Sequence, residues 1–378
     1  MLKKLIAVGI GALVLSGCAL TPNTASKKTA SPEIRVPMAQ IQKGSLWKSS
    51  DSGSSFFPKS KVDEKTFITS ADILSLAFDP TDSRIIYAGT IDNGIFRSQD
   101  GAETWENIPF PPKKIYSYIL DHKNPQRMFA SGILGNHGKV FRTDDGGASW
   151  KDVYTEPGEN TVITAIAEHP VDTNVVFAGT NVGTVIKSTD GGNTWKDVGS
   201  QVNGPVTVIA FDVKLKFSVY LLVLSNKMYY SNDGGKKWQD WESLKRKEEE
   251  KMKLTAKEKE TRDKKKAPDS PLSLSVSPVD SGVLYMANIG GLYKSTDYGK
   301  FWTAINIIES AGKFPIRAIA LHPTDKNEMA FVSGAVFYKT KSGGVTWFVT
   351  PLNIDRGVSV LKYDTYDPNN IYFGLRKL

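Results

Sequence analysis

The segment IFRSQDGAETW, residues 95–105, is the key to the architecture, because its pattern recurs along the chain. The pattern runs as two apolar residues, a basic residue, Ser or Thr, any residue, Asp, any residue, Gly, two further residues and an aromatic residue. Seven copies occur, with some departures: LWKSSDSGSSF (46–56), IFRSQDGAETW (95–105), VFRTDDGGASW (140–150), VIKSTDGGNTW (185–195), MYYSNDGGKKW (228–238), LYKSTDYGKFW (292–302) and FYKTKSGGVTW (337–347). The aspartate position holds Asp51, Asp100, Asp145, Asp190, Asp233, Asp297 and Ser342.

A second repeated unit lies between these copies. It consists of a strand-like run, a turn and another strand-like run, clearest at 73–90, 162–180, 272–288 and 316–334, with weaker copies starting near Ile115, Val206 and Val358. Each period therefore holds four short strands, and most periods span about 45 residues, which is typical of a β-propeller blade. We predict an all-β protein, a ring of seven four-stranded antiparallel blades over residues 44–378.

The order of the repeats predicts how the ring closes. The chain begins the propeller with an Asp-containing hairpin that lacks its first two strands, and it ends at 358–375 with two strands that lack a hairpin. Pairing residues 46–56 with 358–375 would complete one blade and remove the free sheet edges.

The repeated aspartates have a structural explanation. An Asp side chain accepts hydrogen bonds from the backbone N–H groups of the turn that follows it, and Gly supplies the positive φ of that turn. A catalytic or calcium-binding role is the alternative. Seven equivalent copies spread around a ring cannot converge on one substrate, so we expect Asp51, Asp100, Asp145, Asp190, Asp233 and Asp297 to be structural.

This eleven-residue pattern resembles the Asp box, or bacterial neuraminidase repeat, over residues 46–378. The same box is similar to features of sialidases, xyloglucan-cleaving enzymes, sortilin-type receptors and the photosystem II assembly-factor family. The last family is the nearest in layout, and the resemblance implies a role in building a membrane complex. Phe56, Ala102 and Ser342 depart from the box and bear on the rigidity of their turns.

The first residues predict export and lipidation. Lys3 and Lys4 precede a short apolar run from Leu5 to Leu15, too short to span a bilayer. The run ends in Leu-Ser-Gly-Cys18, which resembles the bacterial lipoprotein box; a plain secretory signal with an incidental cysteine is the alternative. We expect a signal peptide at 1–17, an acylated Cys18 followed by a flexible tether to 43, and a location in the bacterial cell envelope. The anchor would hold the protein on the outer membrane, which Ala19 favours, or on the extracytoplasmic face of the cell membrane.

Composition excludes several kinds of site. One cysteine and four histidines rule out a disulfide framework and leave too few ligands for a Cys/His zinc centre. The net charge of +8 falls to +6 without residues 1–17, too little to indicate nucleic acid as a partner. We therefore expect no metal and no nucleic acid. We also expect no cofactor and a monomeric protein.

Two basic features fall on the face opposite the Asp turns, where the loops that enter the innermost strands gather. Arg317, Arg356 and Arg376, with Lys313 and the more distant Lys114, are candidate carboxylate or phosphate ligands; unrelated surface arginines are the alternative. The second feature is an insertion at 243–271 that carries 11 basic and 6 acidic residues between Lys245 and Lys266. It is either a solvated charged protrusion, in part helical, or a docking element for an acidic protein or anionic lipid.

Function remains open between two classes. A non-catalytic propeller that binds a protein or peptide partner at the membrane is the primary prediction. A glycoside hydrolase, sialidase-like or glucan-cleaving, is the alternative, since several acids are expected on the same face: Asp72, Asp92, Glu156, Glu159, Glu309 and Asp355. His169 and His322 precede a proline in the second unit and are expected to cap turns rather than to act chemically.

Overall fold

The computed structural model describes residues 43–63, 68–199, 202–224, 227–252, 270–308 and 315–377. The chain divides into two units, Met1–Ala39 and Gln40–Leu378, and every described residue belongs to the second. The predicted signal peptide, Cys18, the tether up to residue 42, Lys313 and Glu309 lie outside the described residues. Within the described part, no helix combines the length and the apolar character needed to cross a bilayer.

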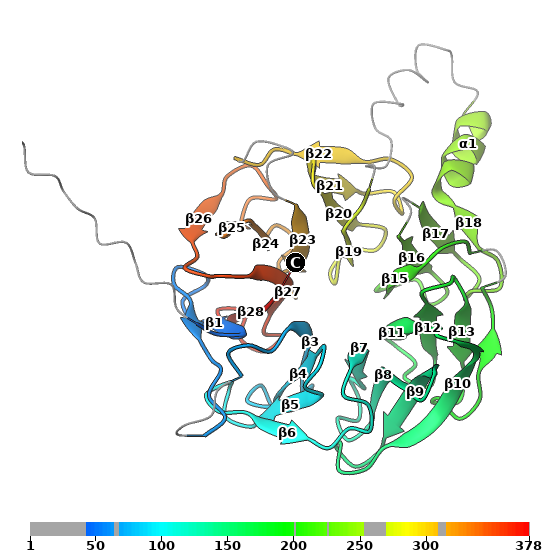
Figure 1. Cartoon of the computed structure of the whole chain (residues 1–378). Coiled ribbons are helices and arrows are strands. Elements are labelled where there is room, and N and C mark those ends of the chain that lie inside the picture. The colour runs from blue at the N-terminus through cyan, green and yellow to red at the C-terminus, as the bar shows by residue number, and fades with distance from the viewer. Residues whose placement is uncertain are drawn as a thin grey trace, which may run out of the picture. The chain divides into compact units, whose positions relative to one another are not determined.

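The described residues of the second unit form seven four-stranded antiparallel sheets arranged as the blades of a ring (Figure 1). The predicted fold class is confirmed. The sheets are blade 1, β3(Ile73–Phe78) β4(Ile86–Thr90) β5(Ile95–Ser98) β6(Glu106–Ile108); blade 2, β7(Ile115–Leu120) β8(Met128–Leu134) β9(His137–Thr143) β10(Lys151–Glu159); blade 3, β11(Ile163–Glu168) β12(Val176–Thr180) β13(Val185–Ser188) β14(Lys196–Asp197); blade 4, β15(Val206–Phe211) β16(Val219–Val223) β17(Lys227–Ser231) β18(Gln239–Asp240); blade 5, β19(Ser273–Val276) β20(Leu284–Asn288) β21(Gly291–Ser295) β22(Thr303–Ile305); blade 6, β23(Ile316–Leu321) β24(Met329–Ser333) β25(Val336–Thr340) β26(Phe348–Pro351); and blade 7, β27(Gly357–Tyr363) β28(Ile371–Arg376) β1(Leu46–Ser49) β2(Phe57–Pro58).

Blade 7 combines strands from the first and the last segments of the propeller sequence. β1 pairs antiparallel with β28, with Leu46 opposite Gly374 and Ser49 opposite Ile371. The buried ring of Trp47 stacks on Phe373 at a centroid distance of 5.8 Å. The pairing of β1 with β28, which we call the seam, therefore has the same ladder and the same kind of core as the other blades.

The Asp turns fold by local hydrogen bonds. Asp190 accepts from the Thr194 backbone N–H at 2.9 Å and from its hydroxyl at 2.6 Å, and the Ser188 hydroxyl donates to the same carboxylate. The second glycine of the box also fixes the neighbouring blade. Gly192 has φ of +84°, and a Cβ there would lie 2.5 Å from the Phe129 ring of blade 2. The box thus joins its turn to the preceding blade.

Two departures from the box keep this turn geometry. Ser342 takes the place of the aspartate, and its hydroxyl oxygen accepts from the Thr346 N–H at 2.8 Å. Ala102 takes the place of a glycine and adopts φ of +76°, with its N–H donated to the Ser98 hydroxyl at 2.8 Å. The turns at these positions therefore keep the hydrogen bonds of the other copies.

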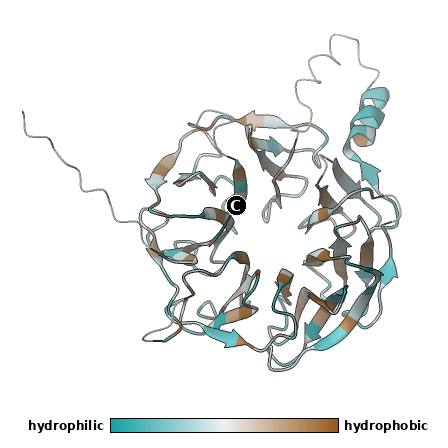
Figure 2. Ribbon diagram, viewed as in Figure 1, coloured by the Kyte–Doolittle hydropathy of each residue, from teal (hydrophilic) through white to brown (hydrophobic). Residues whose placement is uncertain are grey.

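The apolar core is divided among the interfaces between blades. One cluster packs Phe177 of blade 3 against Val206 and Leu221 of blade 4, and another packs Leu46 and Tyr372 of blade 7 against blade 1. Each of the seven interfaces between described blades has a cluster of this kind. Figure 2 shows apolar segments on the strands around the whole ring. Each sheet thus depends on its neighbours to cover its faces.

The turn after each innermost strand is closed by a side chain that accepts two backbone N–H groups. His169 accepts at Nδ1 from Val171 and Asp172, and His322 does so from Thr324 and Asp325. Asp79, Asp121, Asp212, Ser277 and Asp364 have the same role in the other blades. The prediction that both histidines cap turns is confirmed.

The insertion begins with a helix. α1(Trp241–Lys251) starts two residues before the expected boundary, where the Asp240 carboxylate accepts from the Ser243 N–H at 3.0 Å. Trp241 is buried and packs edge-on against Trp302 of blade 5, with 5.9 Å between ring centroids. Residues 253–269 lie outside the described part of the chain.

The pairing of β1 with β28 at the seam leads to a prediction about stability. Trp47→Ala removes a buried ring stacked on Phe373 and should lower the free energy of unfolding by about 3–5 kcal/mol in urea denaturation. Phe57→Ala in β2 is the matched control, because this ring is 56% exposed, and it should change stability by less than about 0.5 kcal/mol. Equal effects would contradict a packed seam.

The hydrogen bonds of the Asp turns predict how the stability of the protein depends on pH. Hydrogen bonds from Ser149 and Thr194 lower the pKa of Asp145 and of Asp190 to about 2, below the value of about 3.9 in an unfolded chain. These carboxylates therefore contribute stability above about pH 4, and that contribution is lost as the pH falls towards 2.

The double variant Asp145→Asn/Asp190→Asn tests this pH dependence. It keeps an acceptor oxygen at each site but has no charge, so it should be less stable than the native protein at pH 6. The difference in urea midpoint should shrink on acidification towards pH 2. A difference that stays constant over this range would mean that the charges of Asp145 and Asp190 do not stabilise the turns.

Candidate binding site

The innermost strands of six blades share an irregularity that the sequence does not reveal. Their register with the second strand shifts near the start of the innermost strand, as between Ile73 and Ser75 or between Val358 and Val360. The residue inside the shift is a β-bulge residue, and bulges redirect side chains. In this position stand Leu74, Tyr116, Thr164, Thr207, Arg317 and Ser359.

The bulge residue can reach the next blade. The Thr164 hydroxyl donates to the Val206 carbonyl oxygen of blade 4, and the Ser359 hydroxyl donates to the Ile73 carbonyl oxygen of blade 1. Arg317 replaces such a hydroxyl with a guanidinium at the start of β23. Its Nε is buried and has no hydrogen-bond partner among the described residues.

Arg376 joins Arg317 at this face. It ends β28 directly opposite Gly357, the first residue of β27, and its Nε is likewise buried without a partner among the described residues. Neither arginine forms an ion pair with a residue that the structure describes. Two guanidinium groups are thus available to a ligand.

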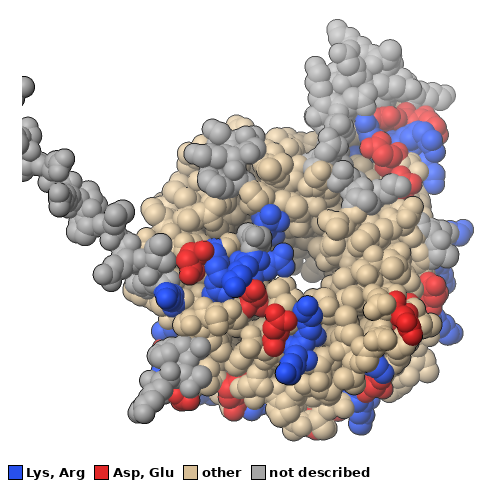
Figure 3. Space-filling model, in the orientation of Figure 1, with Lys and Arg blue, Asp and Glu red and all other residues tan. Residues whose placement is uncertain are grey.

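A pocket of about 530 Å³ lies between the starts of β23 and β27. Arg317, Arg356 and Lys377 contribute its basic side chains, and Asp355 is the acid in its lining. The remaining lining residues are Pro315, Val332, Gly334, Ala335, Ile354, Gly357 and Val358. Figure 3 shows basic side chains gathered beside the opening of the ring in this region. We call this cavity the arginine pocket.

Arg356 differs from Arg317 in that its guanidinium is already engaged. Its side chain is 9% exposed and holds together the two ends of the propeller. Its acceptors are the carbonyl oxygens of Gly44 (2.9 Å), Thr69 (2.8 Å) and Ala71 (2.9 Å), the Ser45 hydroxyl (3.1 Å) and Asp72 (3.4 Å). Arg356 is therefore a positioning residue that shapes the pocket wall.

The other basic residues that the sequence predicted are not found at this site. Lys114 is exposed and precedes β7 of blade 2, whereas the arginine pocket lies between blades 6 and 7. Lys313 lies outside the described residues. Lys377 was not predicted, although it follows Arg376 at the end of the last strand and its place in the sequence could have indicated it.

The acids expected at a hydrolytic site are distributed over several blades. Asp72 and Asp355 both contact Arg356, at 3.4 Å and 3.6 Å. Asp72 also accepts the Lys377 backbone N–H at 2.8 Å. Glu156 is buried in β10 and accepts from the Tyr154 hydroxyl at 2.9 Å, while Asp92 and Glu159 are exposed. Asp72 and Asp355 are thus partners of a positioning arginine.

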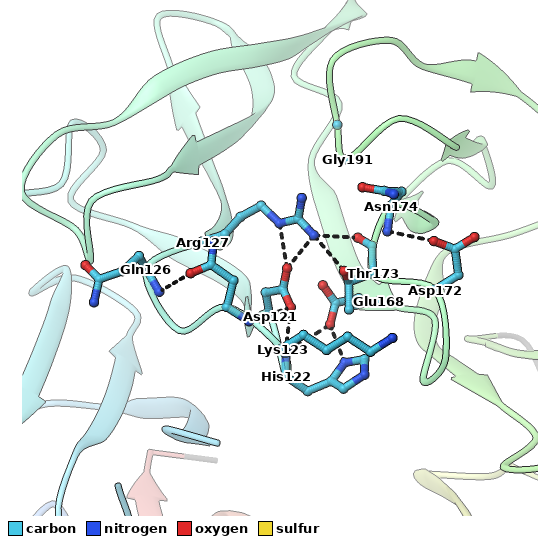
Figure 4. Close-up of polar contacts among 12 residues, drawn as sticks. Asp121, His122, Lys123, Gln126, Arg127, Glu168, Asp172, Thr173, Asn174 and Gly191 are labelled. Atoms are coloured by element: carbon cyan, nitrogen blue, oxygen red, sulfur yellow. Dashed lines mark hydrogen bonds and ion pairs between the residues drawn. The ribbon is translucent and has the colours of Figure 1, made fainter. Parts of the chain in front are cut away.

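A partly buried polar cluster at the far end of the innermost strands joins blades 2 and 3 (Figure 4). Glu168 accepts from the His122 ring at 2.8 Å, and burial raises the pKa of Glu168. Asp121 accepts from Arg127 Nε at 2.6 Å, and Arg127 also donates to Thr173 of blade 3.

Donor atoms of Asp121, His122 and Glu168 lie within 4.8 Å of one another, close enough to consider a metal ion. However, both carboxylate oxygens of Asp121 are engaged by N–H groups, and the Arg127 guanidinium opposes a cation. We therefore interpret the cluster as a polar contact between blades. Comparison of the repeats could have found it, since Glu168 stands where other blades have Phe78, Leu120, Phe211, Val276, Leu321 and Tyr363.

Comparisons with known proteins give the fold but not a detailed function. The family Sortilin-Vps10 (sortilin, neurotensin receptor 3) matches residues 138–268. No curated protein sequence matches the chain. Among solved structures, the GH74 enzyme of Niastella koreensis is similar at a TM-score of 0.63 and 18% identity, over 81% of this chain and 51% of that one. The GH74 xyloglucanase of Xanthomonas campestris gives a TM-score of 0.62 and 15% identity over 81% and 51%.

A third similar structure is that of YCF48 bound to D1 peptide, at a TM-score of 0.61 and 14% identity. The alignment covers 84% of this chain and 98% of that chain, whereas this chain spans about half the length of the GH74 enzymes. The ring of seven blades and these similarities show that the chain has the β-propeller fold. The eleven-residue repeats and the partial match to the sortilin family support a relationship to the propellers with Asp-box (BNR) repeats.

Proposed function

We propose that this propeller binds a protein or peptide partner through carboxylates that enter the arginine pocket. The observation that carries the proposal is Arg317, which lines the pocket and whose buried Nε lacks a partner among the described residues. Arg376, whose Nε is likewise buried without such a partner, lies opposite Gly357 of the pocket lining. A buried donor without a partner costs free energy, and a carboxylate that accepts two parallel N–H bonds from a guanidinium would remove that cost.

The surroundings suit a bound peptide. Arg356 fixes the pocket wall through backbone carbonyls of three segments, so little ordering is required on binding. Val332, Ile354 and Val358 add apolar surface beside the charges. The similar structure of YCF48 with D1 peptide supports a peptide ligand on a ring of this kind.

We further propose that acyl chains on Cys18 hold the ring at the bacterial cell envelope, in agreement with the basic, apolar and Leu-Ser-Gly-Cys segments before it. The anchor would raise the local concentration of membrane partners and thereby strengthen a modest contact at the arginine pocket. The charged insertion at 243–271 is a second proposed contact with such a partner, and help in assembling a membrane complex is the corresponding process.

A glycoside hydrolase remains a second candidate, since two GH74 enzymes share the fold over 81% of this chain. In glycoside hydrolases of the common type two carboxyl groups flank the scissile bond. Here the acids beside the pocket, Asp72 and Asp355, both contact Arg356. This arrangement favours the binding function. Release of reducing ends from xyloglucan by the purified protein would favour the hydrolase instead.

The contrast between Arg356 and Arg317 can be measured as stability. Arg356→Met leaves three backbone carbonyls and Asp72 without their donor, so it should lower the free energy of unfolding by about 2–3 kcal/mol. Arg317→Met removes a buried donor without partners among the described residues, so it should leave the free energy of unfolding unchanged or raise it. Urea denaturation of both variants checks this, and the reverse order would refute the assigned roles.

Binding itself can be tested with a fluorescent pool of decapeptides that each contain two Asp or Glu residues. We expect fluorescence anisotropy to detect binding to the native protein, and at least tenfold weaker binding to Arg317→Met/Arg376→Met. A pool with Asn and Gln in the same places should bind the native protein as weakly as the acidic pool binds this variant.

The matched control is Lys114→Met, which removes an exposed basic residue outside the pocket. It should leave the affinity unchanged. Equal binding of both pools, or an equal loss in the Lys114 variant, would contradict the proposed site.

A further inference from the structure

Comparison of the seven innermost strands reveals one charged residue at a position that is otherwise small or apolar. Lys362 of β27 lies opposite Tyr372, as Ala77 lies opposite Tyr87 and Ala210 opposite Tyr220. The corresponding residues of the other blades are Ala77, Ile119, Ala167, Ala210, Ser275 and Ala320. Lys362 is therefore the one charged residue at this position of the seven innermost strands.

Lys362 lines a second, smaller cavity of about 300 Å³. Three consecutive innermost strands, β19, β23 and β27, form it, and these strands lie around the axis of the ring (Figure 1). The lining is otherwise uncharged: Ser275, Val276, Pro278, Ile319, Ala320, Leu321, Leu361 and Tyr363. Lys362 is exposed to this cavity, while its chain neighbours Leu361 and Tyr363 are buried. We call this cavity the axial pocket.

The amine of Lys362 has no counter-charge. Among the described residues none makes a hydrogen bond or an ion pair with Nζ, and the lining of the axial pocket contains no acid. Glu328, which contacts the adjacent residue Tyr363, is engaged by the Tyr363 hydroxyl at 3.3 Å and by Lys339 at 3.5 Å. Arg317 and Arg376 lie at the other ends of their strands.

This environment disfavours an isolated positive charge. Lys362 is exposed to solvent in the pocket, but the neighbouring strands displace part of the water around its side chain, and this loss of hydration lowers the pKa of Lys362. An anion beside Nζ would compensate for the lost hydration, because an ion pair is stronger in a partly dehydrated site than in open water. A ligand that carries both one negative charge and an apolar body would match the charge and the apolar lining together.

From this geometry we propose that the axial pocket is a second ligand site, in which Lys362 binds a small monocarboxylate with a compact apolar body. The site is separate from the arginine pocket. Arg356 and Lys362 are six residues apart along an extended segment, which corresponds to about 20 Å. A ligand in one pocket would not contact the other.

The test uses sodium butyrate as the probe and NMR of the full protein with ¹³C-labelled lysine side chains. The Lys362 signal is the one absent from the spectrum of Lys362→Met. If butyrate binds the protonated amine, its addition at about ten times the dissociation constant should raise the pKa of Lys362 by about one unit. Butyramide, which has the same shape without the charge, should leave the pKa unchanged, and inorganic phosphate, which lacks the apolar body, should raise it less at equal concentration.

The matched control is Lys187, whose pKa is also lowered by burial but whose Nζ donates to the Gly234 carbonyl oxygen at 2.8 Å. Its signal should not respond to butyrate, and Lys187→Met should keep the response of Lys362. Lys362→Met should fold, melt at a higher temperature than the native protein, and lose the increase in melting temperature that butyrate causes. An unchanged pKa of Lys362 in saturating butyrate, or an equal shift with butyramide, would overturn the proposal.

Discussion

The structure depends on mutual coverage of the blades. A single four-stranded sheet has two faces to bury, and in this ring each interface holds its own apolar cluster. No blade can be stable alone, so the blade assembled from the two ends of the propeller is as necessary as the others. Arg356 strengthens that seam from outside the core, since it binds carbonyl oxygens at Gly44, Thr69 and Ala71.

Because seven copies build the scaffold, a residue that departs from its equivalents is informative. The aspartates and the turn caps occur in almost every blade and are engaged within their own turns. Arg317 and Lys362 occur in one blade each, at positions where the others have hydroxyl or apolar side chains. Arg317 lies on blade 6 and Lys362 on blade 7, towards opposite ends of their innermost strands. The repeated residues thus explain the fold, and the exceptional ones carry the proposed binding sites.

Much of the fold followed from the sequence because its determinants are local. An Asp turn is complete within eleven residues, and His169 and His322 cap turns that begin at their own positions. The site could not be predicted to the same depth. The bulge that presents Arg317 depends on the register with β24, and the hydrogen-bond acceptors of Arg356 are 284 to 312 residues away in sequence. The sequence alone does not distinguish Arg317 from Arg356. Only the contacts made in the folded protein show that Arg356 is a positioning residue and that Arg317 is a candidate ligand residue. Cys18 and Lys313 stay predictions.

Native-state hydrogen exchange tests the closed ring most directly. If β1 completes blade 7, the amides of Trp47 and Ser49 in β1 and those of β28 should exchange only through global unfolding, with the same free energy of opening. They should match the protected amides of a central blade such as β12 in blade 3. Exchange from β1 at a much lower free energy than from β12 would mean that the first hairpin opens on its own and that β1 does not close the ring.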